Sequence, residues 1–407
     1  MFKLKYMEEV FVIDAVRTPV GKYAGALSGV RPDDLLAVVI KALLKRNDSI
    51  DVNAIEDVIA GAANQSGEDN RNVARMSALL AGLPVTVAGI TVNRLCASGL
   101  QAIMDASRAI ACGDAELMIA CGVESMSRAP FVMPKAETAF ARTPQVYDTT
   151  MGWRFTNPAL SSLYQPFTMG ETAENVAKQW NISRHAQDEF AQESQQKYAD
   201  ANKANRFAEE LIPVQVQVGK ESFLFEKDEH PRLGTLEKLT QLKPAFIKDG
   251  TVTAGNSSGI NDGASAMLLA SKAAVIKYGL IPMATVCSMA VSGVEPSIMG
   301  IGPVPATLKA LQRAKITVAD LDLIELNEAF ASQSIACIHE LGLDIEKVNV
   351  NGGAIAIGHP LGASGVRIAT TLLHQMKKTN ANYGLATMCI GVGQGAAIIF
   401  KGIPEKK

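Results

Sequence analysis

Two stretches of the chain repeat one order of elements, and this repeat decides the fold: CASGLQAIMDASRAIACGDAELMIACGVES at 96–125 and GASGVRIATTLLHQMKKTNANYGLATMCIGVG at 362–393. Each carries an Ala-Ser-Gly triplet, then a helical pattern, then an apolar run that contains a cysteine. Apolar runs also precede both, in IEDVIAG at 55–61 and DLDLIELNEAF at 320–330. These landmarks keep nearly equal spacing, which predicts a duplicated α/β unit. Two unrelated α/β units of similar composition are the alternative.

A duplication would also place the turns. Equivalent turns of two related halves meet around a pseudo-twofold axis. Cys96, which precedes the first ASG triplet, and the HPLGASG turn at 359–365 would then lie together.

The composition is that of a globular protein with a large core. Of 407 residues, 48% are hydrophobic and 20% charged, and the net charge of −2 gives no electrostatic basis for binding nucleic acid or an anionic membrane. No apolar run is long enough to span a membrane, and MFKLKYMEEV at 1–10 is not a secretory signal. The six cysteines show no CxxC pair and no metal-ligand spacing. We therefore expect reduced thiols, no metal and a cytoplasmic protein.

Short apolar runs alternate with helical patterns outside the middle of the chain. Residues 10–18, 55–63 and 116–125 are predicted strands, and 33–46 is a predicted amphipathic helix. The continuous apolar runs favour buried parallel strands.

The middle of the chain differs from both ends. Residues 126–253 are more polar, carry both tryptophans and include a charged stretch at 171–204 that is predicted as one long helix. We expect an inserted loop domain here, within an N-terminal half at 1–275 that precedes a C-terminal half at 276–407.

Cys96 is a candidate nucleophile. Apolar spacing predicts a helix that begins near Ala97–Ser98, so the thiol would face unpaired backbone N–H groups and the positive end of the helix dipole. Both favour the thiolate. A small buried cysteine under a turn is the alternative.

His359 is the histidine best placed for chemistry, because it lies in the glycine-rich NGGAIAIGHPLGASG at 351–365. His185, His339 and His374 lie in charged or terminal parts of helices, where surface positions are expected. A hydrogen bond that only stabilises the turn is the alternative role for His359.

Two further groups follow apolar strands. Cys389 opens CIGVGQG, which no clear helix follows and which is therefore not a dinucleotide-binding loop; Asn327 opens NEAF, where a helix cap is the alternative role. Together with Cys96 and His359, these residues indicate Claisen chemistry on a thioester: one thiolate takes an acyl group, a second thiol moves a proton at carbon, and amides stabilise oxyanions.

Through its motifs the chain resembles a known family, the thiolases, over essentially its whole length. The motifs that carry the resemblance are VNRLCASG (92–99), MGETAEN (169–175), TAGNSSGINDGA (253–264), NEAF (327–330), NGGAIAIGHPLGASG (351–365) and CIGVGQG (389–395). The resemblance implies an α/β thiolase fold: two duplicated βαβαβαββ halves in a five-layer αβαβα body, with the inserted region covering coenzyme A.

The resemblance also implies roles for five residues. Cys96 would be acylated, His359 would take its proton, and Cys389 would be the acid and base at the α-carbon of acetyl-CoA. Asn327 would hold a water that forms one oxyanion hole with His359. The backbone N–H groups of Cys96 and Gly391 would form the other.

Coenzyme A would be the shared substrate, with no permanently bound cofactor. Its adenine and phosphate end would face Arg232, and its pantetheine would pass Ser258. The remaining contacts implied by the resemblance are Met169, Ala245, Phe246, Ala254, Ala329 and Phe330. Thr168 departs from acetoacetyl-specific members, which carry histidine there. The stretch after DEHPR (228–232) is one residue shorter than in those members, which leaves its contacts open.

The substrate is suggested by two segments, GAANQSGEDNRNVARM at 61–76 and YDTTMGWRFTNP at 147–158, which resemble 3-oxoadipyl-CoA thiolases of aromatic degradation. That substrate ends in a carboxylate, so Arg154 is a candidate to bind it; a surface ion pair or an oligomer contact is the alternative. A general acetyl-CoA acetyltransferase or a 3-ketoacyl-CoA thiolase of fatty-acid metabolism remains open, as do acyl-chain preference and direction.

Two other classes of protein fit these motifs less well. A ketoacyl synthase would carry Cys-His-His, and Cys389 argues against it; a non-catalytic coenzyme A-binding protein would not need Cys96, Asn327, His359 and Cys389. The resemblance implies a homo-oligomer, a dimer or a tetramer built from two dimers.

Overall fold

The computed structural model describes residues 8–403. Within them ten strands form one sheet in the order β12-β13-β14-β11-β1-β10-β5-β3-β4, with β2 beside β10. The strands are β1 (Val10–Arg17), β2 (Gly21–Lys22), β3 (Ile55–Gly61), β4 (Ala88–Val92), β5 (Leu117–Ser125), β10 (Asn261–Ser271), β11 (Ala284–Gly293), β12 (Leu323–Leu326), β13 (Tyr383–Ile390) and β14 (Gln394–Gly402).

The sheet consists of two related halves that join where β1 meets β11. The joint is short and antiparallel, Phe11 opposite Thr285 and Val12 opposite Ala284. Outward from it, the order β1-β10-β5-β3 on one side matches β11-β14-β13-β12 on the other. The predicted duplication is therefore confirmed. The expected parallel pairing holds for β3 with β4 and β5 and for β12 with β13, whereas β10 and β14 run antiparallel to their neighbours.

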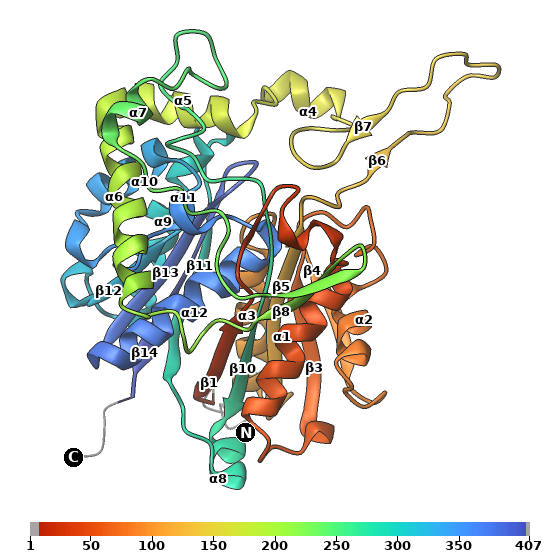
Figure 1. Ribbon diagram of the computed structural model, residues 1–407. Coiled ribbons are helices and arrows are strands. Elements are labelled where there is room, and N and C mark those ends of the chain that lie inside the picture. The colour runs from red at the N-terminus through yellow and green to blue at the C-terminus, as the bar shows by residue number, and fades with distance from the viewer. Residues whose placement is uncertain (1–7, 404–407) are drawn as a thin grey trace, which may run out of the picture.

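The two halves of the sheet form two layers of strands, and helices lie between these layers and on both outer faces, which gives five layers. The principal helices are α1 (Pro32–Arg46), α2 (Val73–Leu80), α3 (Ser98–Cys112), α9 (Pro303–Ala314), α10 (Ala331–Leu341) and α12 (Leu361–Thr379). Helices α3 and α12 lie in the middle and contact strands of both halves, while α1 and α2 cover one outer face and α9 and α10 the other (Figure 1). The αβαβα architecture expected from the resemblance is confirmed.

The two ASG triplets meet at the crossing of α3 and α12. A Cβ on Gly365 would lie 2.0 Å from the backbone N of Leu100, and one on Gly99 would lie 2.8 Å from the carbonyl O of Gly362. Any larger residue would push the helices apart, because these neighbours are backbone atoms that cannot turn away. The repeated glycine therefore allows the central layer to close.

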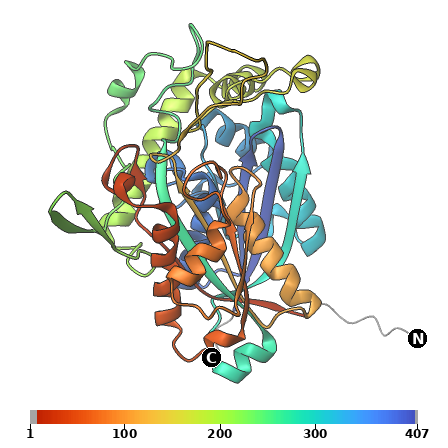
Figure 2. The same ribbon diagram turned by 90° about the vertical axis from the view of Figure 1, so that its right-hand side faces the viewer.

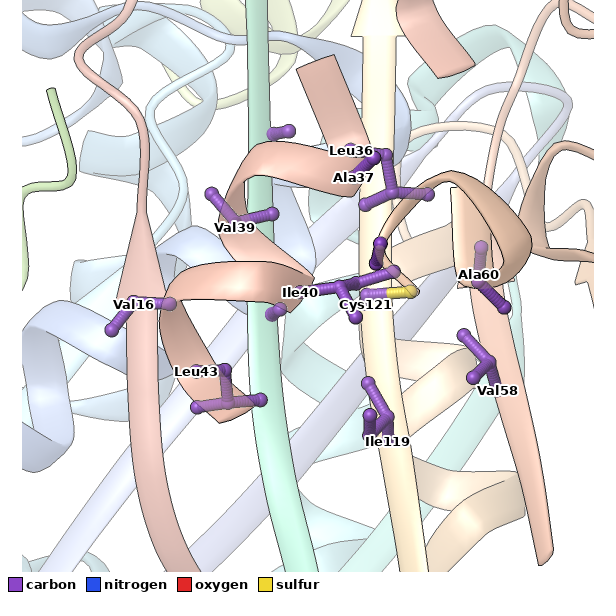
Figure 3. Packing of buried hydrophobic residues seen from close by; sticks show 14 of the residues in the cluster. Val16, Leu36, Ala37, Val39, Ile40, Leu43, Val58, Ala60, Ile119 and Cys121 are labelled. Atoms are coloured by element: carbon purple, nitrogen blue, oxygen red, sulfur yellow. The ribbon is translucent and has the colours of Figure 1, made fainter. Parts of the chain in front are cut away.

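The core of the first half shows why the predicted amphipathic helix forms. Leu36, Ile40 and Leu43 of α1 follow helical spacing and are fully buried against β5, where Ile119 and Cys121 face them (Figure 3). Burial of each such aliphatic side chain contributes about 1.5–3 kcal/mol.

The inserted region covers the upper part of the body in the view of Figure 1, and its β6–β7 arm extends away from it. Its elements are β6 (Phe131–Val132), β7 (Tyr147–Asp148), α4 (Pro158–Leu163), α5 (Met169–Gln179), α6 (Arg184–Lys203), β8 (Val214–Val218), β9 (Glu221–Phe225) and α7 (Leu236–Thr240). The β8–β9 ribbon stands out separately (Figure 2). Shorter elements elsewhere are η1 (Ala26–Gly29), η2 (Val52–Ala54), α8 (Lys272–Tyr278), η3 (Pro296–Ile301), η4 (Val318–Asp320), η5 (Ile345–Lys347) and α11 (Ala354–Ile357).

The prediction of one long helix at 171–204 is wrong. Helix α5 ends at Gln179, Asn181 adopts a left-handed φ of 52°, and Ser183 caps a new helix by accepting a hydrogen bond from the N–H of Ala186. Asparagine tolerates this conformation and serine is a good N-cap, so the Asn-Ile-Ser segment turns the chain between two helices.

The expected surface position of His374 is also wrong. The ring is buried, and its Nε2 donates to the carbonyl O of Ala15 at 2.9 Å. Because α12 lies between two layers of strands, even a residue near its end faces β1 rather than solvent. His185 and His339 are exposed, as expected.

No helix within residues 8–403 is long and apolar enough to cross a membrane.

Candidate active site

The residues selected from the sequence lie on four segments of the chain, two of them at the starts of the central helices. Cys96 precedes α3, His359 precedes α12, Asn327 follows β12, and Cys389 lies near the end of β13. The Nδ2 of Asn327 lies 3.5 Å from the Nε2 of His359. The amides of Gly391 and of Cys96 itself face the Cys96 sulfur, whose charge also acts on Cys389. Asn327 thus lies beside His359, and Cys96 lies beside Gly391 and Cys389, while the contact of Gly99 with Gly362 and Gly365 brings the starts of α3 and α12 together.

The electrostatics of Cys96 are opposite to the expectation. Burial of the thiol raises its pKa to about 11, although the Gly391 and Cys96 amides oppose this change, and part of the residue remains exposed. Desolvation of a thiolate outweighs two amide dipoles. Cys96 is therefore a neutral thiol at rest and needs a base when it reacts.

His359 is arranged as that base. Its Nδ1 lies 2.6 Å from the Oγ of Ser364, and that hydroxyl donates its own proton to the carbonyl O of Pro360 at 2.9 Å. Because a hydroxyl has one proton, Ser364 must accept from Nδ1–H. We therefore assign the lone pair of the ring to Nε2, on the side of Asn327. Burial and the charge of Arg367 lower the pKa of His359 to about 3, so the ring is neutral.

Cys389 is buried, and this burial, reinforced by the negative charge that Cys96 can carry, raises its pKa well above the usual value. A thiol in that state is an acid that gives up its proton only to a strong base such as a carbanion. The two cysteines thus differ in surroundings as well as in position.

Glu328, which follows the same apolar strand as Asn327 but received no role from the sequence, supports the turns around Asn327. Its buried carboxylate accepts from the Oγ of Ser194 at 2.7 Å, from the Nδ2 of Asn349 at 2.7 Å and from the N–H of Ile355 at 3.1 Å. Ser194 belongs to the insertion, and Ile355 belongs to the segment 351–365 that carries His359. One carboxylate therefore ties the insertion to the active-site turns.

The residues assigned to coenzyme A form a continuous wall. The ring of Phe246 meets that of Phe330 edge-on at 6.1 Å, and the N–H of Ser258 donates to the carbonyl O of Ala329 at 3.0 Å. Met169 opens α5, and a Cβ on the adjacent Gly170 would lie 2.0 Å from Phe246. The glycine of the MG pair therefore makes room for the aromatic wall.

The remaining wall residues lie on loops next to this one. Arg232 donates to the carbonyl O of Ala254, and the N–H of Ala245 donates to the carbonyl O of Val252 at 2.9 Å. All eight residues selected from the resemblance thus lie on three connected loops and the ends of two helices.

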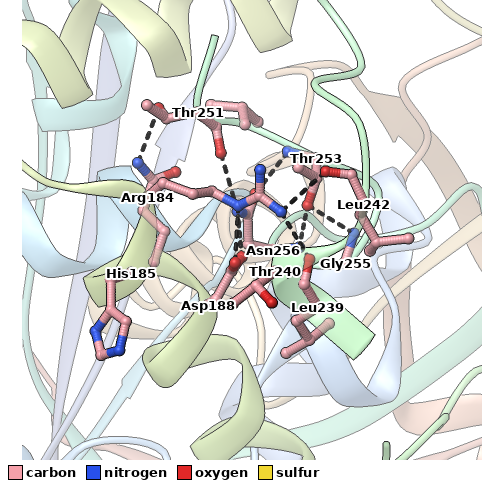
Figure 4. Close-up of polar contacts among 12 residues, drawn as sticks. Arg184, His185, Asp188, Leu239, Thr240, Leu242, Thr251, Thr253, Gly255 and Asn256 are labelled. Carbon is pink, nitrogen blue, oxygen red and sulfur yellow. Dashed lines mark hydrogen bonds and ion pairs between the residues drawn. The ribbon is translucent and has the colours of Figure 1, made fainter. Parts of the chain in front are cut away.

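A polar cluster behind this wall fixes the loop at 251–258 (Figure 4). Arg184 pairs with Asp188 at 2.7 Å, and Asp188 accepts from the Nδ2 of Asn256 at 2.9 Å. Arg184 also donates to the carbonyl O of Leu239 at 2.7 Å. The cluster joins α6, α7 and the loop into one unit.

Two residues of the insertion, Thr168 and Arg154, were linked to the substrate by sequence resemblance, and the structure shows their contacts. Thr168 is the N-cap of α5 and forms a reciprocal pair with Glu171. The Nη2 of Arg154 lies 3.3 Å from the Oδ1 of Asn64, whose N–H donates to Glu124. Because Glu124 also accepts from Gly362, Arg154 lies two hydrogen-bonded residues from the turn that carries His359.

Within residues 8–403, no three His, Cys, Asp or Glu side chains are grouped as metal ligands.

Comparison with known proteins agrees with this geometry. The thiolase N-terminal domain family matches residues 10–273 and the thiolase C-terminal domain family matches 280–402. This chain belongs to the thiolase family, and it is an acyltransferase.

Particular relatives are close. The chain is 58% identical to the beta-ketoadipyl-CoA thiolase of Pseudomonas aeruginosa, over 96% of this chain and 98% of that one. It is 54% identical to the 3-oxoadipyl-CoA/3-oxo-5,6-dehydrosuberyl-CoA thiolase of Escherichia coli K12, over 97% and 100%. The crystal structure of the Bacillus anthracis acetyl-CoA acetyltransferase superposes with a TM-score of 0.92 at 40% identity, covering 98% of this chain and 100% of that one.

Proposed function

We propose that this thiolase cleaves 3-oxoadipyl-CoA with coenzyme A, giving acetyl-CoA and succinyl-CoA. The observation that carries the chemistry is that Cys96 lies beside Cys389 and the Gly391 amide, and that the start of α3, which follows Cys96, contacts the start of α12, which follows His359. The substrate is supported by the two relatives whose names include it.

The first step forms an acyl-enzyme. The Cys96 sulfur attacks the 3-keto carbon while Nε2 of His359 takes the thiol proton. The resulting alkoxide collapses, the C2–C3 bond breaks and the succinyl group stays on Cys96. The electron pair of the broken bond remains on the acetyl-CoA fragment as an enolate, which takes a proton from Cys389. This order uses the neutral state of both thiols.

The second step returns the enzyme. Acetyl-CoA leaves, and the thiol of an incoming coenzyme A gives its proton to the Cys389 thiolate and attacks the succinyl thioester. Succinyl-CoA is released, and the Cys96 thiolate takes back the proton held by Nε2 of His359.

Two oxyanion holes would stabilise these steps. The amides of Cys96 and Gly391, which already face the Cys96 sulfur, would form one. Asn327 and a water held with His359 would form the other. The Oδ1 of Asn327 is buried and has no hydrogen-bond partner within residues 8–403, which supports a polar guest at this point. One such donor contributes about 2.7–4 kcal/mol to the transition state.

Coenzyme A would lie along the wall of Phe246, Phe330 and Ser258, with its phosphates toward Arg232. No resident cofactor or metal is proposed. The distal carboxylate of the substrate would bind Arg154, whose side chain is partly buried against the loop after β3.

We also propose a homo-oligomer. Strand β4 is an edge of the sheet, and Ile90 on it, with Leu79, Leu80 and Val85 nearby, is exposed. An apolar edge strand favours pairing with a second copy. The β6–β7 arm exposes Phe131, Met133 and Phe140, the last at 98%, which supports its use as a contact between two dimers.

The remaining proposals concern organisation. We propose an N-terminal half at 1–275 with the insertion at 126–253, a C-terminal half at 276–407, and a cytoplasmic location. The low number of cysteines and the lack of a CxxC pair in the sequence support reduced thiols in that compartment.

The experiment that tests the substrate is a side-by-side measurement of kcat/KM on 3-oxoadipyl-CoA, acetoacetyl-CoA and a long-chain 3-ketoacyl-CoA. The proposal expects the first to be highest. A higher value on acetoacetyl-CoA would replace it with a general acetyl-CoA acetyltransferase, to which the capping role of Thr168 gives no support.

A further inference from the structure

Two strained turns face each other across the site. Leu95, directly before Cys96, has a φ of 48°, and Val392, directly after Gly391, has a φ of 63°. Neither is glycine, and valine is β-branched, so each conformation is unfavourable and must be held by the surrounding structure. A Cβ on Gly391 would lie 3.3 Å from the Cδ1 of Leu95, so the turns are in contact.

One side-chain bridge joins the two turns. The Nη1 of Arg94 donates to the Oε1 of Gln394 at 2.9 Å, across 300 positions of sequence. The backbone of Gln394 is fixed by pairing with Ile390 on one side and Gly293 on the other. Gln394 is therefore a firm anchor in the second half for an arginine in the first.

Arg94 is itself held in one orientation. Its Nε donates to the Oε1 of Gln101 at 2.7 Å, and its backbone N–H donates to the Oγ of Ser98 at 2.9 Å. Gln101 donates in turn to Asp105 at 2.7 Å. The bridge thus connects helix α3, the Cys96 turn and the Gly391 turn into one chain of hydrogen bonds.

We propose that Arg94 and Gln394 are positioning residues that hold the Cys96 sulfur in register with the Gly391 amide. Neither touches the reacting atoms in this account; each acts through the turn next to it. The inference rests on the proposed roles of Cys96 and Gly391. Loss of the bridge would let the strained turns relax, and the amide would then no longer face the oxygen that becomes negative when the Cys96 sulfur bonds to the substrate carbonyl carbon.

The test compares variants of the full-length enzyme. Arg94→Met and Gln394→Met each remove the bridge and leave an unbranched apolar side chain, and Gln394→Glu keeps an oxygen for Arg94. Arg108→Met is the control, because it removes a nearby arginine, on α3, whose partner Asp105 lies at the far end of the hydrogen-bond chain, and it leaves the Arg94–Gln394 bond in place.

Each methionine variant should lower kcat and the rate of Cys96 acylation about 10- to 100-fold, as a small displacement of reacting groups does. The KM for coenzyme A should stay within about twofold of wild type, since the wall residues are untouched. Gln394→Glu and Arg108→Met should keep near-wild-type kcat, and the double methionine variant should be no slower than the slower single variant.

Wild-type kcat in both methionine variants, or additive losses in the double variant, would overturn the inference. The inference would also fail if the methionine variants lost kcat and melting temperature together and Gln394→Glu restored neither. If Arg94→Met does not fold, Gln394→Met and Gln394→Glu decide the question. Cys96→Ser separates a failure of the proposed function from a failure of the bridge. Activity in Cys96→Ser would refute Cys96 as the nucleophile. An inactive Cys96→Ser beside methionine variants of normal activity would refute only the role of the bridge.

Discussion

Ser364 holds His359 in a single tautomer. Its Oγ lies 2.6 Å from Nδ1 of the ring, and its hydroxyl donates a hydrogen bond to the carbonyl O of Pro360. The ring can then accept a proton only at Nε2, the nitrogen nearest Asn327. The serine of the second ASG triplet therefore determines which nitrogen acts as the base.

Ser364→Ala should lower kcat about tenfold or more, because general-base catalysis contributes about 10²–10⁴-fold and the tautomer with Nε2 protonated would compete. The KM for coenzyme A should be unchanged. Thr370→Ala is the control, since Thr370 makes the same kind of backbone bond on α12 without contacting histidine. Steady-state kinetics check both, and equal losses in the two variants would assign Ser364 a structural role alone.

Alkylation of Cys96 should accelerate throughout the neutral and alkaline range. With a thiol pKa of about 11, the thiolate fraction, and with it the rate, rises about tenfold per pH unit. The check is the rate of modification by iodoacetamide, followed by mass spectrometry of the Cys96 peptide. The pH should run from roughly 6 to 9.5, a range that includes the pKa of about 8.5 of an ordinary free thiol. Acyl-CoA should block the reaction. A plateau reached near neutral pH would mean that the helix dipole prevails over burial.

Arg154→Ala should reduce kcat/KM on 3-oxoadipyl-CoA about 10- to 100-fold, the worth of a charge-assisted hydrogen bond. Activity on acetoacetyl-CoA, which has no distal carboxylate, should change little. Arg142→Ala is the control, because Arg142 is an exposed arginine of the same insertion. Equal activity of wild type and Arg154→Ala on 3-oxoadipyl-CoA would remove Arg154 from the acyl pocket.

The sequence predicted the features of the fold that follow from the order and spacing of its residues. The repeated ASG triplets indicated the duplicated halves, and the same glycines allow α3 and α12 to touch. The strand at 55–61 and the start of α3 at Ser98 follow from local periodicity. These features are local, and they remain when the chain is packed.

What depends on packing was not predictable. The pKa of Cys96 rises because residues from both halves bury it, and His374 is buried because α12 is a central helix. The break between α5 and α6 depends on the conformation of Asn181, which helical spacing does not reveal. Ser364 was visible only as part of a triplet, and its contact with His359 needed the turn.

The central claim is that Cys96 carries the acyl group. Its most direct test is to incubate the enzyme with 3-oxoadipyl-CoA without free coenzyme A, then denature it and map the modified peptides by mass spectrometry. The account predicts a succinyl group on Cys96, acetyl-CoA released in equal amount, and no acyl group on Cys389. An unmodified Cys96 together with released acetyl-CoA, or a succinyl group on Cys389, would contradict it.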